Sequence, residues 1–166
     1  MGAVNESFLF ERDSSPGARG AFSSPPKRTL FPEGTEFCRI VTAANKRTGD
    51  KGNEVFGSPW WIPRETFRKI VSRLDPKGLG ISDVARIDLA VPKTFNPKMD
   101  WFCRIYLTRP AYGWVGKAAR QLATDGANIY WGGGAEQVFL PNLAPKDAAS
   151  SDWARLRYFG MLPDFF

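Results

Sequence analysis

One stretch, residues 128–141, limits what this chain can fold into more than any other. It reads Asn-Ile-Tyr-Trp-Gly-Gly-Gly-Ala-Glu-Gln-Val-Phe-Leu-Pro. Three consecutive glycines let the backbone adopt positive φ and let a ligand approach the main chain closely. The apolar run after them is typical of a buried strand, and the proline ends it. We therefore expect a loop of unusual conformation that leads directly into a core strand.

Two polar side chains, Glu136 and Gln137, stand where this strand begins. Neighbouring residues of a strand point to opposite faces, so only one of the two can face a cleft on a given side. Gly-Gly between apolar runs is also a common hairpin signal, and a plain β-hairpin turn without a ligand is the alternative interpretation. The choice between them depends on what the rest of the chain supplies.

Composition places the chain among compact, turn-rich domains. Its 166 residues suit one domain, and 43% of them are hydrophobic, which is enough for a sizeable core. The 16 glycines and 13 prolines argue against a helical bundle. The net charge of +6 suits an anionic partner such as nucleic acid, an acidic membrane or a phosphate-bearing small molecule. Because the basic residues are scattered and form no long block, nucleic acid is the weaker of these interpretations.

The chain has no histidine, which excludes Ser-His-Asp and Cys-His catalysis and nearly all catalytic zinc sites. We expect no metal site. Cys38 and Cys103 each lie in an apolar run that predicts a strand, so buried free thiols are expected. One disulfide is the alternative if those strands are neighbours. No apolar run approaches the roughly 18 residues of a membrane span, and the N-terminus shows no signal-peptide pattern.

The order of apolar patterns predicts an α+β domain. Residues 1–30 contain Ser-Ser-Pro-Gly and Ser-Ser-Pro-Pro, which are typical of a flexible linker, so we expect the compact domain to span residues 31–166. Apolar residues at i, i+3, i+4 and i+7 predict a helix over 63–74. The other expected elements are strands at 36–42, 84–91, 101–109 and 110–116 and short helices at 117–124 and from 151 onward.

Arg39 interrupts the apolar pattern of the first predicted core strand. It shares a face with Phe37 and Val41. An arginine on an apolar face is costly unless its guanidinium finds an anion or hydrogen-bond acceptors. It is therefore a candidate for binding an anionic ligand in a cleft. The alternative is an edge-strand arginine that reaches water.

Aromatic residues mark two further segments. Trp60 and Trp61 lie between prolines and cannot both be buried on one side, so one of them can form a platform for a ligand. The alternative is that both simply cover the core. Tyr112 lies in a short aromatic strand whose glycines leave room beside it.

Three features together resemble a known family. They are the strand arginine Arg39, the segment 57–61 (Gly-Ser-Pro-Trp-Trp) before the helix, and the run 132–141 (Gly-Gly-Gly-Ala-Glu-Gln-Val-Phe-Leu-Pro). This order resembles the ADP-ribosyltransferase toxin superfamily, over about residues 31–143. Within it, the chain is most similar to the NAD-glycohydrolase toxins of the tuberculosis necrotizing toxin type, which are C-terminal domains of bacterial polymorphic toxins. The resemblance implies a split, mostly antiparallel β core with few short helices.

The resemblance also implies which residues would act on NAD. The family's strand-one arginine holds the pyrophosphate or ribose, and Arg39 occupies that position. The family places a Glu or Gln directly before the final apolar strand, and Gln137 fits that place best, with Glu136 one residue away. A transferase would normally carry a second acidic or amide residue two positions earlier, where this chain has Ala135. The implied NAD-binding residues are Ser58, Trp60, Trp61, Tyr112, Gly133 and Gly134.

The expected function is therefore an NAD glycohydrolase toxin that cleaves NAD to nicotinamide and ADP-ribose and depletes the NAD of a target cell. NAD is a substrate here and no cofactor is expected; use of NADP stays open. The resemblance implies secretion or delivery into the cytoplasm of a target cell, and a cognate immunity protein as partner. Two alternatives stay open: a mono-ADP-ribosyltransferase toxin that uses Glu136, and a non-enzymatic basic module that binds nucleic acid.

The chemistry of the residues agrees with this expectation. Cleavage of the nicotinamide–ribose bond builds positive charge on the ribose, as in glycoside hydrolysis. Nicotinamide is already a good leaving group, so substrate binding, distortion and a hydrogen bond to a ribose hydroxyl can supply much of the rate. A chain without histidine can do this. The chain has no GxGxxG sequence, which disfavours hydride transfer with NAD on a Rossmann fold.

Overall fold

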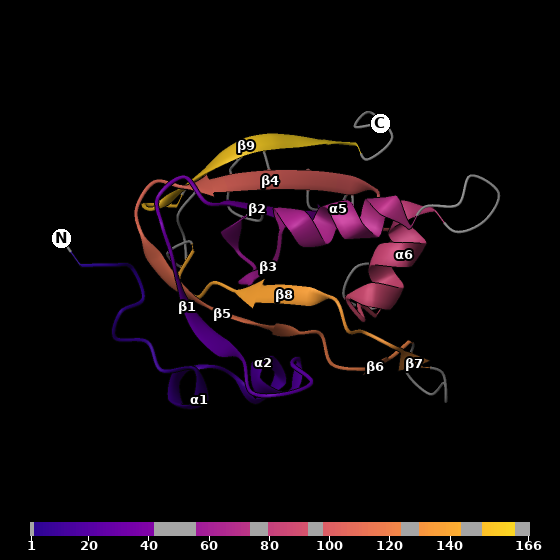
Figure 1. Cartoon of the computed structure of the whole chain (residues 1–166), viewed down its shortest axis with the longest axis horizontal. Coiled ribbons are helices and arrows are strands. Elements are labelled where there is room, and N and C mark those ends of the chain that lie inside the picture. The colour runs from indigo at the N-terminus through magenta and orange to yellow at the C-terminus, as the bar shows by residue number, and fades with distance from the viewer. Residues whose placement is uncertain are drawn as a thin grey trace.

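A computed structural model describes residues 2–41, 56–73, 80–92, 98–123, 130–143 and 151–161. The core is an antiparallel sheet with few short helices, so the predicted α+β class is confirmed (Figure 1). The seven strands of the main sheet, in spatial order, are β1 (Lys27–Phe31), β5 (Ala111–Lys117), β8 (Glu136–Phe139), β3 (Trp60–Pro63), β2 (Glu36–Val41), β4 (Trp101–Leu107) and β9 (Ala154–Met161). A two-stranded sheet pairs β6 (Gln121–Leu122) with β7 (Tyr130–Trp131). Within the described ranges, the helices are α1 (Phe10–Asp13), α2 (Pro16–Gly20), α5 (Arg64–Ser72) and α6 (Ile81–Asp88).

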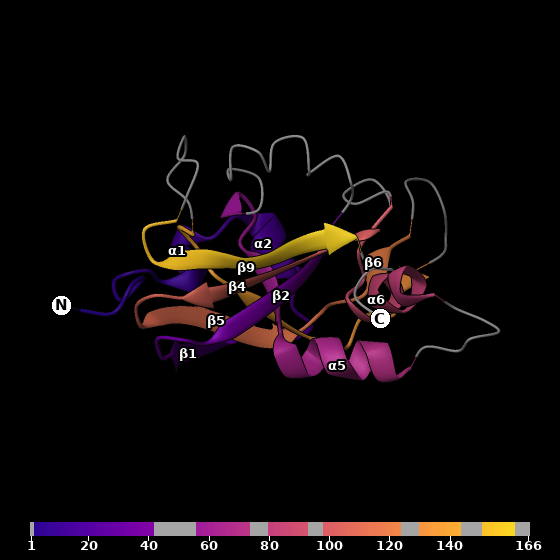
Figure 2. The same ribbon diagram turned by 90° about the horizontal axis from the view of Figure 1, so that it is seen from above.

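The main sheet is split at β3. Ile62 and Pro63 pair with β2, whereas Trp60 and Trp61 pair with β8. Strand β2 pairs with β4 along its full length, whereas its pairing with β3 ends before Arg39. The sheet thus consists of one half with β1, β5 and β8 and another with β2, β4 and β9, which Figure 1 shows one below the other with β3 between them. Figure 2 shows β9 running along β4 at the edge of the second half.

Three apolar clusters stabilise this arrangement. The first lies between the two halves and includes Phe37, Trp61, Ile105 and Val138 from four different strands. The second covers the other face of β2 and β4 with side chains of α5 and α6. The third packs the N-terminal segment against Trp114 of β5 and strands β3 and β8. Each half therefore has one face toward the shared core and one face covered by a separate short element.

The N-terminal segment is folded against the sheet, which differs from the linker expected for residues 1–30. Phe10 and Phe22 are buried against Trp114 and Phe139. Hydrogen bonds join Val4 N to the Pro110 carbonyl at 2.9 Å and Tyr112 N to the Val4 carbonyl at 2.9 Å. The physical reason is that aromatic side chains bury far more apolar area than the Ser-Pro composition suggests. The expected domain boundary also falls at the end of β1, which is paired with β5 along its full length.

Three other elements differ from the sequence prediction. In the segment 84–91, expected as a strand, residues 84–88 lie in helix α6, where the Asp83 carboxylate accepts a hydrogen bond from Gly80 N at 3.2 Å and so caps the helix. The helix expected at 117–124 is replaced by the end of β5 and by β6. The helix expected from 151 onward is strand β9, because its apolar residues pair along β4. The strands expected at 36–42, 101–109 and 110–116 and the helix expected at 63–74 are confirmed as β2, β4, β5 and α5, with residues 42 and 74 outside the described ranges.

The two cysteines are buried free thiols, as the sequence predicted. Cys38 pairs in register with Arg104, and Cys103 pairs with Arg39. Their side chains therefore lie on opposite faces of neighbouring strands, Cys103 in the cluster between the halves and Cys38 in the cluster under α5. Sulfurs on opposite faces of a sheet cannot join without a change of register.

Thiol reactivity provides a first prediction. Burial raises the pKa of Cys38 and that of Cys103 to about 12. Because the thiolate is the reactive form, we expect both thiols of the native protein to react with an aromatic disulfide reagent at pH 8 at least about 100-fold more slowly than in 6 M guanidinium chloride. Release of the coloured thiolate measures both rates. Fast modification of either thiol in the folded chain would contradict the burial described here.

Candidate functional site

An open cleft of about 880 Å³ lies where β2 and β3 separate. Its volume is within the range of about 300–1,000 Å³ that is usual for small-molecule and cofactor sites. It is lined by the N-terminal segment, by β2, β3 and β8, by residues 89–92 after α6, and by residues 139–143. Of the residues proposed from the sequence, the cleft brings together Arg39, Ser58, Trp60, Trp61 and Gln137.

Gln137 is the second residue of β8 and is only 9% exposed. Its Nε2 donates a hydrogen bond to the Ala21 carbonyl at 2.8 Å. A buried amide needs such partners, because an unpaired polar group in an apolar environment is costly. Since the amide nitrogen donates to the N-terminal segment, the other polar atom of the Gln137 amide, Oε1, is the one that can accept a further hydrogen bond.

Arg39 lies on β2 and is partly buried. Its guanidinium carbon is 5.8 Å from the centre of the Trp61 ring, within the range of a cation–π contact. Trp61 is 1% exposed, so this contact holds the arginine beside a fixed aromatic surface. The Arg39 side chain, which strand β2 carries, is thus held in the lining of the cleft.

The strand register places the two candidate side chains on different faces of the sheet. Arg39 shares its face with Trp61, whereas Gln137 shares its face with Trp60 and Phe139. Both nevertheless line the same cleft, which lies where the two halves of the sheet separate. A single ligand that touches both must therefore be extended and must cross the split.

The two tryptophans have different environments. Trp61 is buried between the sheet halves, whereas Trp60 is partly exposed and contacts Phe22 and Phe139, with ring centres 5.3 and 5.1 Å away. Trp60 is thus the better candidate for a platform. Ser58 Oγ accepts a hydrogen bond from Trp60 N at 3.4 Å, which shapes the turn before β3.

The triple glycine is not a hairpin turn. It connects β7 of the small sheet to β8 of the main sheet. Gly133 and Gly134 have φ of 69° and 93°, the left-handed region that favours glycine. Gly133 N donates to the Ile87 carbonyl at 3.0 Å and Gly134 N to the Ala118 carbonyl at 2.9 Å. The segment therefore docks on the end of α6, and neither glycine lines the cleft.

Two other candidates also lie outside the cleft lining. Tyr112 is on β5 under the guanidinium of Arg28, which is 3.7 Å from the ring centre. Glu136 is exposed, pairs in register with Lys117, and shares the face of Val138, which is also the face of Arg39. Register thus favours Glu136 as a neighbour of Arg39, whereas burial and the cleft lining favour Gln137.

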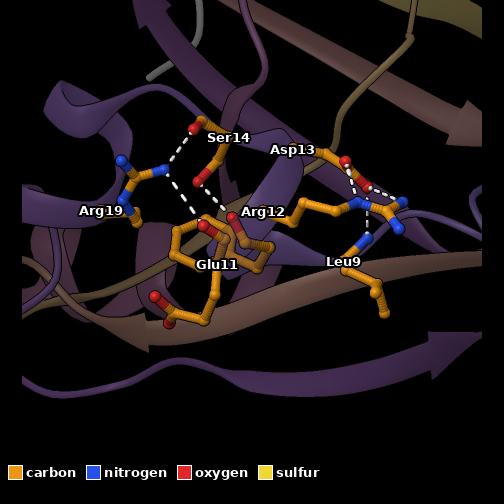
Figure 3. Close-up of polar contacts among 7 residues, drawn as sticks. Leu9, Glu11, Arg12, Asp13, Ser14 and Arg19 are labelled. Carbon is orange, nitrogen blue, oxygen red and sulfur yellow. Dashed lines mark hydrogen bonds and ion pairs between the residues drawn. The ribbon is translucent and has the colours of Figure 1, made fainter.

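The lining also includes a segment that the sequence interpretation placed outside the domain. Phe8, Asp13, Ser14 and Ala18 all line the cleft. Figure 3 shows how polar contacts hold this segment: Leu9 N donates to the Asp13 carboxylate at 2.8 Å. The signal that could have found it is the apolar run 8–10 followed by a serine-capped turn, in which Ser15 Oγ accepts from Ala18 N.

These features define a class of fold: an α+β domain with a split antiparallel sheet and a cleft at the split. Among solved structures, this fold is similar to that of Tne2 in its complex with Tni2, with a TM-score of 0.52 and 17% identity over 82% of this chain and 92% of the other. Tse6 in complex with Tsi6 gives a TM-score of 0.41 at 16% identity, over 96% of this chain and 92% of the other. The sequence matches no protein-family model and no curated protein. The similarity to Tne2, at this low identity, shows a shared fold and no more.

None of the helices in the described ranges is long and apolar enough to cross a membrane.

Proposed function

We propose that this chain is an NAD glycohydrolase that acts as a toxin. One observation carries the proposal: Arg39 and Gln137, which the family resemblance singled out far apart in the sequence, line one cleft together with Ser58, Trp60 and Trp61. The shared fold with Tne2 supports it at the level of architecture. The triple-glycine segment supports it indirectly, because it fixes where β8 begins.

The cleft offers the groups that this reaction needs. The C1′–N bond to nicotinamide breaks, its electron pair passes to the nicotinamide nitrogen, and water adds to C1′ with loss of a proton. Positive charge builds on the ribose on the way. In our proposal the Gln137 Oε1 accepts a hydrogen bond from a ribose hydroxyl and orients the sugar as this charge develops.

The anionic half of the substrate is assigned to Arg39. A guanidinium binds a pyrophosphate through two hydrogen bonds, which an ammonium cannot do. A dinucleotide is also the kind of extended ligand that can touch both faces at the split. The net charge of +6 attracts an anionic substrate to the surface. NADP is a second candidate substrate on the same grounds.

The exposed position of Glu136 outside the cleft lining favours hydrolysis over transfer to a macromolecule. The test is a product balance with NAD and no other protein. Hydrolysis yields nicotinamide and free ADP-ribose in equal amounts. A deficit of free ADP-ribose, with label appearing on protein, would identify a transferase. Salt-sensitive binding of nucleic acid without any nicotinamide release would identify a binding module instead.

The toxin part of the proposal rests on the family resemblance and on the Tne2 complex. Tne2 is seen in complex with Tni2. Together with the immunity protein that the family resemblance implies, this leads us to propose that the chain binds a cognate immunity protein. Delivery into the cytoplasm of a target cell follows from the same resemblance. Growth arrest of cells that express the chain, relieved by the co-expressed partner, would support this part of the proposal.

The pH dependence of turnover follows from the titratable groups of the cleft. The hydrogen bond from Arg12 lowers the pKa of Asp13, and burial raises the pKa of Cys38 to about 12. Neither group changes its charge between pH 6 and 8, and the chain has no histidine. We expect kcat/KM for NAD to vary less than about twofold over this interval. A sharp bell near neutrality would instead indicate a titrating carboxylate such as Glu136.

A further inference from the structure

We propose that the N-terminal segment is part of the active site, because its Ala21 carbonyl orients the Gln137 amide so that Oε1 faces the substrate. This inference rests on the proposed function and deepens it. A carbonyl oxygen can only accept hydrogen bonds, so the amide must turn its nitrogen toward Ala21. The 2.8 Å contact therefore selects one of the two orientations of the side-chain amide. The selected orientation leaves an acceptor, and not a donor, for the ribose hydroxyl.

The Ala21 carbonyl is itself fixed by backbone contacts. It also accepts a hydrogen bond from Ala119 N at 2.8 Å, and Ser23 N donates to the Lys117 carbonyl at 3.0 Å. Between these two bonds, Phe22 forms an antiparallel bridge with Ala118. Residues 21–23 thus behave as a short strand added beside the end of β5. A carbonyl held on both sides in this way is a rigid acceptor.

Packing locks the same segment over the Gln137 strand. Gly116 is the register partner of Gln137 on β5. The Phe22 ring lies so close to Gly116 that a Cβ there would be 2.6 Å from the ring. Phe22 in turn contacts Phe10 and Trp60, with ring centres 5.7 and 5.3 Å away. The absence of a side chain at Gly116 therefore lets the N-terminal segment lie directly beside the candidate amide.

The variant Gln137→Glu tests the orientation, because it replaces the donor with a carboxyl of nearly the same size. When protonated, the carboxyl can donate to the Ala21 carbonyl and keep one oxygen as an acceptor. When ionised, it has only acceptors and faces a carbonyl oxygen at hydrogen-bond distance. Burial and the neighbouring Ala21 carbonyl oxygen favour the neutral form of the introduced carboxyl. The pKa of this carboxyl should therefore lie above the ordinary value of about 4.3.

Charged neighbours decide how large this shift is. The described charged or titratable groups on the elements around Gln137 are Glu11, Arg12, Asp13, Arg19, Cys38, Arg39, Asp88, Tyr112, Lys117, Arg120 and Glu136. Asp88 is paired with Arg73, and Lys117 and Glu136 pair with each other in register on the opposite face. Of the others, the arginines Arg19, Arg39 and Arg120 oppose the shift, and the Asp13 carboxylate favours it. The Arg19 guanidinium donates to the Glu11 and Ser14 carbonyls, and that of Arg120 lies over the Tyr130 ring. Arg39 lies on the other face of the sheet and across the split from β8, whereas the Ala21 carbonyl is in direct contact with residue 137 at 2.8 Å.

We expect turnover of NAD by Gln137→Glu to fall at least tenfold from pH 5 to pH 8, as the introduced carboxyl loses its proton. The wild-type chain should stay flat between pH 6 and 8. Circular dichroism at each pH checks that the variant remains folded. A variant whose pH profile runs parallel to that of the wild type would overturn the inference, since a merely structural contact would not change the profile.

A second readout does not need turnover. The thermal midpoint of Gln137→Glu is compared with that of Gln137→Met, which cannot ionise, between pH 4 and 8. If the folded pKa is raised, the stability of the carboxyl variant is fully present below about pH 4.3 and is lost as pH rises through the folded pKa. Its midpoint should therefore fall relative to that of the Met variant. A constant difference would overturn the inference.

The two readouts separate this inference from the proposed function. If the wild-type chain releases no nicotinamide and the midpoint still falls, the proposed function fails, while residue 137 still has the environment that the inference requires. If the wild type releases nicotinamide and the midpoint difference stays constant, the orientation fails and the proposed function stands.

Discussion

Replacing Gln137 with methionine should lower kcat for NAD cleavage about 100-fold or more, because the substitution keeps the volume and removes the hydrogen-bond acceptor from the ribose. Glu136→Ala should have a much smaller effect, since Glu136 is exposed and lies outside the cleft lining. Nicotinamide release by the two variants and the wild type measures both effects. Far-ultraviolet circular dichroism and thermal midpoints serve as folding controls.

The two substitutions together separate three outcomes. A dead Glu136→Ala with an active Gln137→Met would mean that the residue on the Arg39 face carries the chemistry, as the strand register allows. The transferase interpretation would then gain support. Full activity in both variants would mean that the start of β8 only builds the fold.

Arg39→Lys should raise KM for NAD by about 10- to 100-fold. This is the loss of affinity expected when a bidentate, charge-assisted contact with the pyrophosphate is no longer possible. The charge is kept, so general attraction of the anionic substrate is not the cause. Arg68→Lys on the exposed face of α5 is a matched control, because Arg68 lies outside the cleft lining and should leave KM unchanged. Equal KM values for wild type and Arg39→Lys in a folded protein would remove Arg39 from the site.

Several parts of the fold followed from sequence because local pattern and tertiary context agree there. The helix α5 shows an apolar stripe, and two residues of this stripe, Phe67 and Ile70, are buried, together with Thr66, which the stripe does not predict. Arg39 stood out because a cation interrupts an apolar strand face, and it does line the cleft. The strand after the glycines was visible because a proline ends its apolar run.

Other parts depend on partners that a local pattern does not show. In the segment 81–91 the apolar residues fit a period of two as well as a helical one, and the capping contact of Asp83 with Gly80 settles the helix. Strand β9 forms because it can pair with β4 at the edge of the sheet. In this pairing the ring centres of Phe159 and Trp101 are 5.1 Å apart. Propensity is only a weak guide where such tertiary contacts exist.

In the candidate site, too, some residues could be predicted from the sequence and others depend on tertiary contacts. The residues expected to act on NAD came from a family order of motifs, and five of them line one cleft. The contribution of the N-terminal segment to the cleft lining could not be inferred in that way, because its serines and prolines are typical of a linker. Its role depends on Phe10 and Phe22, whose partners Trp114 and Phe139 are far away in the sequence. The hydrogen bond from Gln137 to Ala21 is a contact of the same long-range kind.

The most direct test of this account is a time course of nicotinamide release by the purified wild-type chain with NAD at neutral pH. The account predicts many turnovers per protein molecule, with free ADP-ribose formed in the same amount. A folded wild-type chain that releases no nicotinamide from NAD would contradict it.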